Sequence, residues 1–300
     1  MKCLSKMVVF GFCLGHYLFA DGSPNWQIDG VNEGWKDEFT TLQYFHHSEL
    51  QRQWAWHILG QYHFLGEERV LDFGCGDGKI TAEMSHFIPS GSVLGVDTSA
   101  SMIAFAQRCF PTRYFPNLHF ELVQESDYEK QKYDLIYSFC VLHLVSDPVA
   151  ILKSLQSCLN PDGILLLVIP AGNNPAFFQA ANEMFQKYQL TPPWSSKRDL
   201  ATFVTMRTKE GCLECMKMAN LEPIEINVLH NPTMFYNQEE LAAWMIGTVS
   251  ANWKIPVNLS EVFFHDLIDR MVEIDPDVVD ESGGFSMKLS RIELVAKNKG

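Results

Sequence analysis

The run Val70–Thr81 constrains the fold of this chain more than any other segment. Two apolar residues lead to the acidic Asp72, and Gly74, Gly76 and Gly78 then occupy every second position. Glycine is favoured where φ is positive or where a Cβ would collide with a ligand, and the N-terminus of a following helix attracts anionic or polar groups. The run therefore predicts a buried parallel strand whose carboxyl end meets a nucleotide-like ligand in a doubly wound sheet.

The spacing of the glycines separates several kinds of ligand. A dinucleotide fingerprint reads G-x-G-x-x-G and a phosphate loop reads G-x-x-x-x-G-K-[ST], whereas this chain has D-x-G-x-G-x-G. A carboxylate beside the turn suits a cation, such as the amino acid half of S-adenosylmethionine, better than a pyrophosphate. Taken alone, the turn is equally compatible with a structural strand-to-helix connection.

A second apolar segment, Ser92–Asp97, also ends in an acidic residue. It lies about 20 residues beyond the glycines, where a doubly wound fold places a carboxylate on the ribose hydroxyls. Asp97 is therefore a candidate for ribose binding. It can also serve as the N-cap of a helix that begins at Thr98–Met102.

Further apolar segments alternate with helical patterns, which predicts a parallel sheet covered on both faces. A turn, Asn160–Gly163, closes the helix expected from Pro148 to Leu159. Two later helices are expected to form a cap, at Gln238–Thr248 and Leu259–Ile274. The expected strands after the second are Leu118–Val123, Tyr133–Cys140, Gly163–Ala171, Leu221–Phe235 and Phe285–Lys297.

From about Tyr44 to the C-terminus the chain resembles the class I S-adenosylmethionine-dependent methyltransferases. The most specific pieces are Leu71–Gly78, Gly95–Asp97, Tyr133–Ser138 and Leu159–Gly163. More narrowly, it is similar to the branch of trans-aconitate, malonyl-carrier-protein and juvenile hormone acid carboxyl methyltransferases. That similarity lies in the segments Tyr44–Gln51, Leu142–Val145 and Trp244–Thr248.

The resemblance implies an α/β architecture, with a doubly wound, mostly parallel, seven-stranded Rossmann-like sheet and a helical lid. The methyltransferase domain is expected over residues 40–300, with lid elements around residues 172–220 and 238–280. Residues 21–39 are expected to form an N-terminal extension.

The resemblance also implies S-adenosyl-L-methionine as cofactor and assigns a role to each cofactor-side residue. Asp72 lies near the methionine amino group, Asp97 binds the ribose and Met102 packs on adenine. The backbone of the glycine turn contacts the cofactor closely, and the carbonyl of Ser138 faces the ammonium group. The full expected set is Tyr44, Asp72, Gly74, Cys75, Gly76, Asp97, Thr98, Met102, Gln124, Glu125 and Ser138.

The chain departs from the branch at three places. Gln124 stands where the adenine-side loop usually has an aspartate, although an amide oxygen can still accept from the adenine amino group. Leu144 stands where a tryptophan is frequent. The arginine that trans-aconitate enzymes place after the lid threonine is absent from Val249–Asn252. The resemblance therefore supports methyl transfer better than a tricarboxylic substrate.

On the acceptor side we expect Gln51 and His143 as catalytic residues and Trp244 as a substrate contact. A carboxylic acid is already ionised at neutral pH, so methylating a carboxylate oxygen requires no general base. Two alternatives remain: methylation of a phenol or quinone-type carbon, with His143 as base, and a non-catalytic cofactor-binding protein. His143 and Trp244 also fit structural roles under the lid.

The composition excludes several partners. With 23 basic and 36 acidic residues the net charge is −13, so the chain is expected to repel nucleic acid and to act on a small molecule. The pair Cys212 and Cys215 lies in a helical pattern without further ligands, so no metal is expected. The sequence gives no indication of the oligomeric state.

Residues 1–20 have the layout of a signal peptide but are too short and interrupted for a comfortable membrane span. A start codon assigned too early is an alternative explanation. Because S-adenosylmethionine is made in the cytosol, we expect a cytoplasmic protein, with export or membrane association through this segment as the alternative.

Overall fold

The computed structural model describes residues 38–145, 147–171, 174–195 and 206–299. The segments expected as a leader (1–20) and as most of the N-terminal extension (21–39) lie outside these ranges. Within them no helix is long and apolar enough to cross a membrane.

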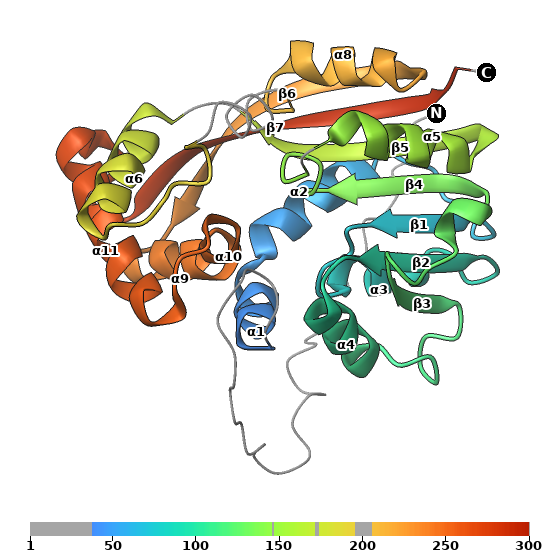
Figure 1. Cartoon of the computed structure of the whole chain (residues 1–300), viewed down its shortest axis with the longest axis horizontal. Coiled ribbons are helices and arrows are strands. Elements are labelled where there is room, and N and C mark those ends of the chain that lie inside the picture. Colours follow the sequence, from blue (N-terminus) through green and yellow to red (C-terminus); the bar gives the residue numbers. More distant parts are fainter. Residues whose placement is uncertain (1–37, 146, 172–173, 196–205, 300) are drawn as a thin grey trace, which may run out of the picture. The chain divides into compact units, whose positions relative to one another are not determined.

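The strands of the described chain form one seven-stranded sheet in the order β3-β2-β1-β4-β5-β7-β6 (Figure 1). Strands β1 to β5 are mutually parallel, and β7 runs antiparallel to both β5 and β6. An isolated bridge joins Val279 to Phe285. The doubly wound, mostly parallel sheet expected from the sequence is thus confirmed. The strands are β1 (Arg69–Phe73), β2 (Ser92–Asp97), β3 (Leu118–Leu122), β4 (Tyr133–Phe139), β5 (Leu159–Ala171), β6 (Leu221–Phe235) and β7 (Phe285–Asn298).

The strand order reverses between β1 and β4, which pair side by side although β2 and β3 separate them in the chain. In open α/β sheets a ligand binds in the crevice outside the carboxyl ends of the strands at such a reversal. The segments after Phe73, Asp97 and Phe139 therefore meet at one edge of the sheet.

The helices begin at residues whose side chains cap them. Ser99, Asp147, Asn174, Thr208 and Asn237 each accept a hydrogen bond from a backbone N–H in the first turn, which satisfies a donor that the helix itself leaves unpaired. The helices are α1 (Glu38–His47), α2 (Glu49–Leu59), α3 (Lys79–Ser85), α4 (Ala100–Cys109), α5 (Pro148–Cys158), α6 (Pro175–Lys187), α8 (Lys209–Met218), α9 (Gln238–Thr248), α10 (Ser250–Trp253) and α11 (Val257–Ile274), with short 3-10 turns η2 (Tyr128–Lys130) and η3 (Pro276–Val278).

Strand β5 begins earlier than the sequence predicts, at Leu159 rather than Gly163. The pairing with β4 jumps from Tyr133↔Leu159 to Leu135↔Ile164, so the expected turn is an irregularity inside the strand. A Cβ on Gly163 would lie 2.8 Å from the carbonyl oxygen of Tyr133. This close approach is why the turn can remain next to β4.

Three apolar clusters hold the elements together. Two of them contain side chains from the central strands of the sheet, as expected for parallel strands buried on both faces. The third joins α6, α9 and α11 through buried side chains such as Phe185, Phe263 and Phe264. Helix α8 contributes Cys212, Cys215 and Met216 to one of the sheet clusters and lies along β6 (Figure 1). Of the lid expected at residues 172–220, residues 172–173 and 196–205 lie outside the described residues. Helix α6 packs with α9 and α11, whereas α8 packs on the sheet.

Candidate active site

The turn after β1 contains three glycines with positive φ, of 84° at Gly74, 54° at Gly76 and 78° at Gly78. A Cβ on Gly74 would lie 2.3 Å from Val141 Cγ2, and a Cβ on Gly78 would lie 2.7 Å from Phe120 Cζ. Glycine is thus required at these two positions for two reasons: the side chains of Val141 and Phe120 leave no room for a Cβ, and φ is positive.

Gly76 differs from its neighbours because the space beside its Cα is open. The nearest heavy atom to a Cβ placed there is Tyr44 Cε1, at 3.7 Å. Its backbone forms part of the wall of a large cavity, together with Tyr44 from α1. Gly76 is therefore a position in this turn where a ligand can approach the main chain, and Gly74 also lines the cavity.

Asp97, at the carboxyl end of β2, is held by backbone N–H groups. Its Oδ2 accepts from Gly76 N at 3.0 Å, and its Oδ1 accepts from Ser99 N at 2.8 Å. Burial raises the pKa of the Asp97 carboxyl, and the hydrogen bonds from the backbone oppose that rise. The carboxylate is consequently oriented before any ligand arrives, at the wall of the same cavity.

Two more acidic side chains belong to this region: Asp72 is in β1 just before the turn, and Asp77 lies within the turn. Asp72 is 4% exposed, and burial raises the pKa of its carboxyl to about 7, although a hydrogen bond from Thr81 Oγ1 at 2.7 Å to Oδ2 opposes the shift. Burial also raises the pKa of the Asp77 carboxyl, against the effect of Lys79. Because the buried anionic forms are costly, a cationic group placed beside this turn would be stabilised.

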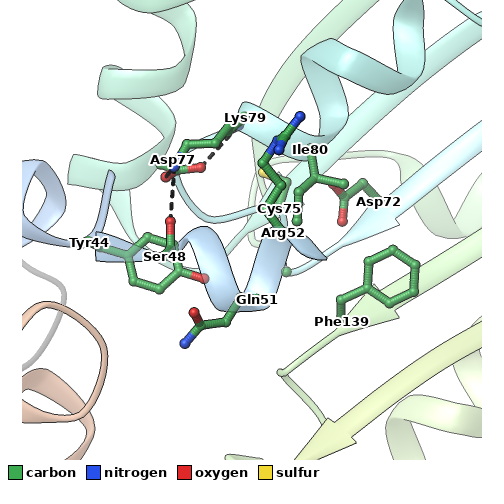
Figure 2. Close-up of a pocket in the computed structure, with 11 residues that line it drawn as sticks. Tyr44, Ser48, Gln51, Arg52, Asp72, Cys75, Asp77, Lys79, Ile80 and Phe139 are labelled. Atoms are coloured by element: carbon green, nitrogen blue, oxygen red, sulfur yellow. Dashed lines mark hydrogen bonds and ion pairs between the residues drawn. The ribbon is translucent and has the colours of Figure 1, made fainter. Parts of the chain in front are cut away.

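Lys79 connects the turn to the junction between α1 and α2. Its Nζ donates to the carbonyl oxygen of Phe45 at 2.6 Å and to Ser48 Oγ at 3.1 Å, and it lies 4.6 Å from the centre of the Phe45 ring. The same ammonium is 3.8 Å from Asp77 Oδ2. Figure 2 shows Ser48, Asp77 and Lys79 together beside Tyr44. The N-terminal helices are in this way fastened over the glycine turn.

A small cavity of about 20 Å³ lies between this junction and β1 (Figure 2). That volume has room for one water molecule. Asp72, Asp77 and Gln51 are among its polar lining residues. A water there can bridge a ligand at the turn to the Asp72 carboxyl; the contact of Asp72 with the methionine amino group stays a prediction.

The large cavity, of about 680 Å³, extends from the glycine turn towards the lid helices. Its volume falls in the range of small-molecule sites. Its lining includes the ends of β1 and β2 and Met102 of α4. It also includes Phe178 of α6 and Trp253 of α10. Beyond the glycine turn, most of the described residues that line the cavity are apolar. The cavity therefore suits a ligand, or two ligands together, with a polar part at the turn and an apolar part beyond it.

Three buried polar atoms at this cavity have no hydrogen-bond partner among the described residues: Gln51 Oε1, His143 Nδ1 and Trp244 Nε1. They come from α2, from the segment after β4, and from α9. An unpaired buried polar atom destabilises a protein by about 1–3 kcal/mol. Their common position at one cavity indicates that a ligand with hydrogen-bonding groups completes them.

His143 is 8% exposed, and burial lowers the pKa of its imidazole well below the ordinary value, with the positive charge of Arg207 acting in the same direction. The ring is therefore neutral at pH 7 and offers one donor and one acceptor. It can donate to a carboxylate, or accept a proton from a hydroxyl group.

The structure brings most of the predicted site residues to these two cavities. Gln51, His143 and Trp244 line the large one. The predicted cofactor residues at one or both cavities are Tyr44, Asp72, Gly74, Cys75, Gly76, Asp97, Thr98 and Met102.

Three predicted residues do not line either cavity. Gln124 and Glu125 are exposed in the turn after β3, while the preceding Val123 lines the large cavity. Ser138 is buried within β4, where its hydroxyl donates to the carbonyl oxygen of Phe73 at 2.7 Å. The expected adenine and ammonium contacts of these residues stay predictions.

Two cationic residues that line the large cavity were not found from the sequence: Arg207, which precedes the cap of α8, and Lys288 of β7. Neither belongs to a motif, because each reaches the cavity through the packing of segments remote from the glycine turn.

For Cys212 and Cys215, both thiols are buried. The described part of the chain contains no cluster of side chains suited to a metal ion.

The residues present fit S-adenosylmethionine. A chain-like, positively charged ligand would meet the open backbone at Gly76, the oriented carboxylate of Asp97 and the other acidic groups of this region. The volume beyond the turn leaves space for a second, mostly apolar molecule.

Comparison with known proteins agrees with this description. The profile described as "Methyltransferase domain" matches residues 66–227. Trans-aconitate 2-methyltransferase of Deinococcus radiodurans is 28% identical over 191 residues, covering 60% of this chain and 68% of that protein. Juvenile hormone acid O-methyltransferase of Bombyx mori is 26% identical over 218 residues, covering 69% of this chain and 75% of that protein.

Among solved structures, the YcgJ protein from Bacillus subtilis superimposes with a TM-score of 0.55 at 17% identity. The match covers 83% of this chain and 100% of that one. At this identity the likeness establishes the fold alone.

Proposed function

The chain belongs to the methyltransferase-domain family and is an S-adenosylmethionine-dependent methyltransferase. We propose that its acceptor is the carboxylate of a small molecule with an apolar body. The observation that carries this proposal is the pair of unpaired ring nitrogens, His143 Nδ1 and Trp244 Nε1, at the large cavity that Gln51 also lines. The carboxylate acceptors named for the relatives from D. radiodurans and B. mori support it.

In this proposal the cofactor lies across the carboxyl ends of β1 and β2. Asp97 accepts hydrogen bonds from the ribose hydroxyls, and the backbone of Gly76 allows close approach. Asp72 faces the methionine ammonium through the small cavity. Tyr44 covers the turn from α1, and Met102 packs against the adenine. When bound, the cofactor supplies a methyl group already activated by the positive charge on its sulfur.

The chain's own contribution is orientation and exclusion of water. The indole N–H of Trp244, the side-chain NH2 group of Gln51 and an imidazole N–H of His143 donate hydrogen bonds to the carboxylate. One oxygen forms the new O–CH3 bond while the C–S bond breaks and its electron pair stays on sulfur. No proton is transferred, because the acceptor is ionised before it binds. Such orientation can contribute roughly 7–11 kcal/mol to lowering the barrier.

A phenolic hydroxyl or quinone-type carbon is the second candidate acceptor. It is favoured by one observation, the buried and neutral imidazole of His143, which can take a proton from a hydroxyl. The two candidates differ in their product, because a methyl ester is cleaved by mild base and an aryl ether is not.

The test is incubation of the purified protein with methyl-labelled S-adenosylmethionine and matched acids and phenols. The proposal expects base-labile product from acids with apolar bodies. The variant His143→Ala is expected to lower ester formation by about 10-fold, as for loss of one hydrogen bond to a charged group. Product only from phenols would replace the proposal by the second candidate, and no product with tight cofactor binding would favour a non-catalytic protein.

We also propose that the protein works in the cytoplasm, because the methyl donor is made there. Mass spectrometry of the N-terminus of the protein isolated from its own cells tests this. An intact N-terminus in the cytosolic fraction is expected, and a chain cleaved near residue 20 in an exported fraction would contradict it.

A further inference from the structure

The large cavity is lined by charged side chains of both signs, which come from different parts of the chain. Among its described lining residues the only acidic side chain is Asp97, beside the glycine turn. The two cationic ones, Arg207 and Lys288, belong to segments that follow the fifth strand. The wall beside the glycine turn therefore suits a cation, and the wall that includes Arg207 suits an anion.

Arg207 lies among the acceptor-side groups. It is partly buried, directly before Thr208, the residue that caps α8. Its positive charge influences both His143 and Cys140, and these two residues line the same cavity after β4. Lys288, in contrast, is exposed on β7. Of the two cationic residues that line the cavity, Arg207 is thus the one whose charge acts on His143.

The charge on Arg207 persists at neutral pH. Burial lowers the pKa of the guanidinium to about 10, which leaves it protonated near pH 7. A guanidinium offers several donors in a planar fork that matches a carboxylate. In a cavity with mostly apolar walls such an ionic hydrogen bond is stronger than at the surface.

Building on the proposed function, we infer that Arg207 determines the specificity of this enzyme for an anionic acceptor. The guanidinium holds one oxygen of the acceptor carboxylate, while Gln51, His143 and Trp244 fix the direction of the other. The nucleophilic oxygen keeps a lone pair directed at the methyl group. The guanidinium stays protonated throughout the transfer.

This role has a consequence for the product. Transfer of the methyl group converts the carboxylate into a neutral ester, so the charge attraction to Arg207 is lost at the moment of reaction. The acid is then expected to bind more tightly than its own methyl ester. A residue that only supports the fold would not create this difference.

The experiment measures steady-state methylation of hexanoate, decanoate and phenylacetate, together with inhibition by the corresponding methyl esters. The variants are Arg207→Gln, which removes the charge, and Arg207→Lys, which retains it. Arg113→Gln is the matched control, because Arg113 is exposed and stacks over Tyr114 outside the cavity. Affinity for S-adenosylhomocysteine is measured for every variant as evidence of an intact cofactor site.

Arg207→Gln is expected to raise KM for the acids by about 10- to 100-fold, as for loss of a charged hydrogen bond, with kcat changed much less. It should also abolish the preference for acid over ester. Arg207→Lys should retain most of that preference, and Arg113→Gln should behave as the wild type. Retention of the preference by a folded Arg207→Gln would overturn the inference. If Arg207→Gln does not fold, the Arg207→Lys variant decides. The inference would be overturned if Arg207→Lys bound each acid no more tightly than its methyl ester.

Failure of the proposed function is recognised separately. If the wild-type protein forms no base-labile ester from any of the acids, the carboxylate proposal itself is wrong for apolar acids. If the wild type forms esters but binds each acid no more tightly than its ester, only the role of Arg207 is wrong.

Discussion

The carboxylate of Asp97 accepts a hydrogen bond from the backbone N–H of Gly76, with 3.0 Å between Asp97 Oδ2 and Gly76 N. This bond joins the ends of two neighbouring parallel strands, β1 and β2, at the point where the cofactor is proposed to lie. The glycine turn and Asp97 therefore form one unit. The backbone N–H of Gly76 orients the carboxylate, and the carboxylate in turn holds the backbone of the turn in place.

Replacement of Asp97 by Ala is expected to weaken binding of S-adenosylhomocysteine about 10- to 100-fold or more, because each hydrogen bond to a charged group contributes about 1.5–3 kcal/mol. Asp97→Asn should have an intermediate effect, since one oxygen acceptor remains. Calorimetric titration measures both. Asp127→Ala serves as control, because Asp127 is an exposed partner of Lys130. Equal affinities for Asp97→Ala and the control would contradict the ribose role.

Replacement of Lys79 by Met should release the junction of α1 and α2 from the glycine turn. The variant loses the hydrogen bonds from Nζ to Phe45 O and Ser48 Oγ. We expect faster amide hydrogen exchange over residues 38–59 and roughly 10-fold weaker cofactor binding.

Lys130→Met is the comparison for this change, because Lys130 forms only an exposed pair with Asp127 in the described chain. Unchanged exchange in Lys79→Met relative to Lys130→Met would show that the ammonium does not fasten the N-terminal helices.

Asp72 predicts a pH dependence of both stability and cofactor affinity. Its pKa is about 7 in the folded protein against an ordinary 3.8, so between these values the native state binds more protons than the unfolded state. The stabilisation of the native state by neutral Asp72 is thus present at low pH and is lost as pH rises towards 7. Affinity for a ligand with an ammonium group should change in the opposite direction, rising from pH 6 to 8.

The variant Asp72→Asn separates these effects. Without ligand it should have a higher Tm than the wild type at pH 8, by roughly a few degrees, and a smaller advantage at pH 5. Its affinity for S-adenosylmethionine should be lower at pH 8 and nearly independent of pH. Thermal unfolding and calorimetry at these pH values measure both, and a wild-type affinity that is flat from pH 6 to 8 would exclude titration of Asp72 at the site.

Gly247 allows α9 to approach α1. A Cβ at this position would lie 2.7 Å from His47 Cβ and 2.8 Å from the carbonyl oxygen of Gln43. Gly247→Ala is therefore expected to destabilise the protein by about 1–3 kcal/mol, despite the better helix propensity of alanine. Thermal unfolding measures the effect, and a Tm equal to or above that of the wild type would show that the two helices can separate at no cost.

The features that the sequence predicted well are those encoded by neighbouring residues. Strand β1, the positive-φ glycines after it and the acidic end of β2 depend on short segments with strong local preferences. The bounds of α9 and β6 agree with the expected ranges for the same reason. These segments are sufficient to place the cofactor side of the fold.

The features that the sequence did not predict depend on long-range packing. Arg207 reaches the cavity because the chain returns to it after the fifth strand, and no local pattern distinguishes this arginine from others. The link from Lys79 to Phe45 joins residues 34 positions apart. The different surroundings of Gly74 and Gly76 likewise follow from where Val141 packs.

The most direct test of the central claim is calorimetric titration of the purified wild-type protein with S-adenosylhomocysteine. If the glycine turn and Asp97 hold the cofactor, one molecule per chain binds saturably with a Kd of about 1–100 μM, and Asp97→Ala strongly weakens this binding. A folded protein that shows no saturable binding at millimolar concentrations of this ligand would contradict that claim.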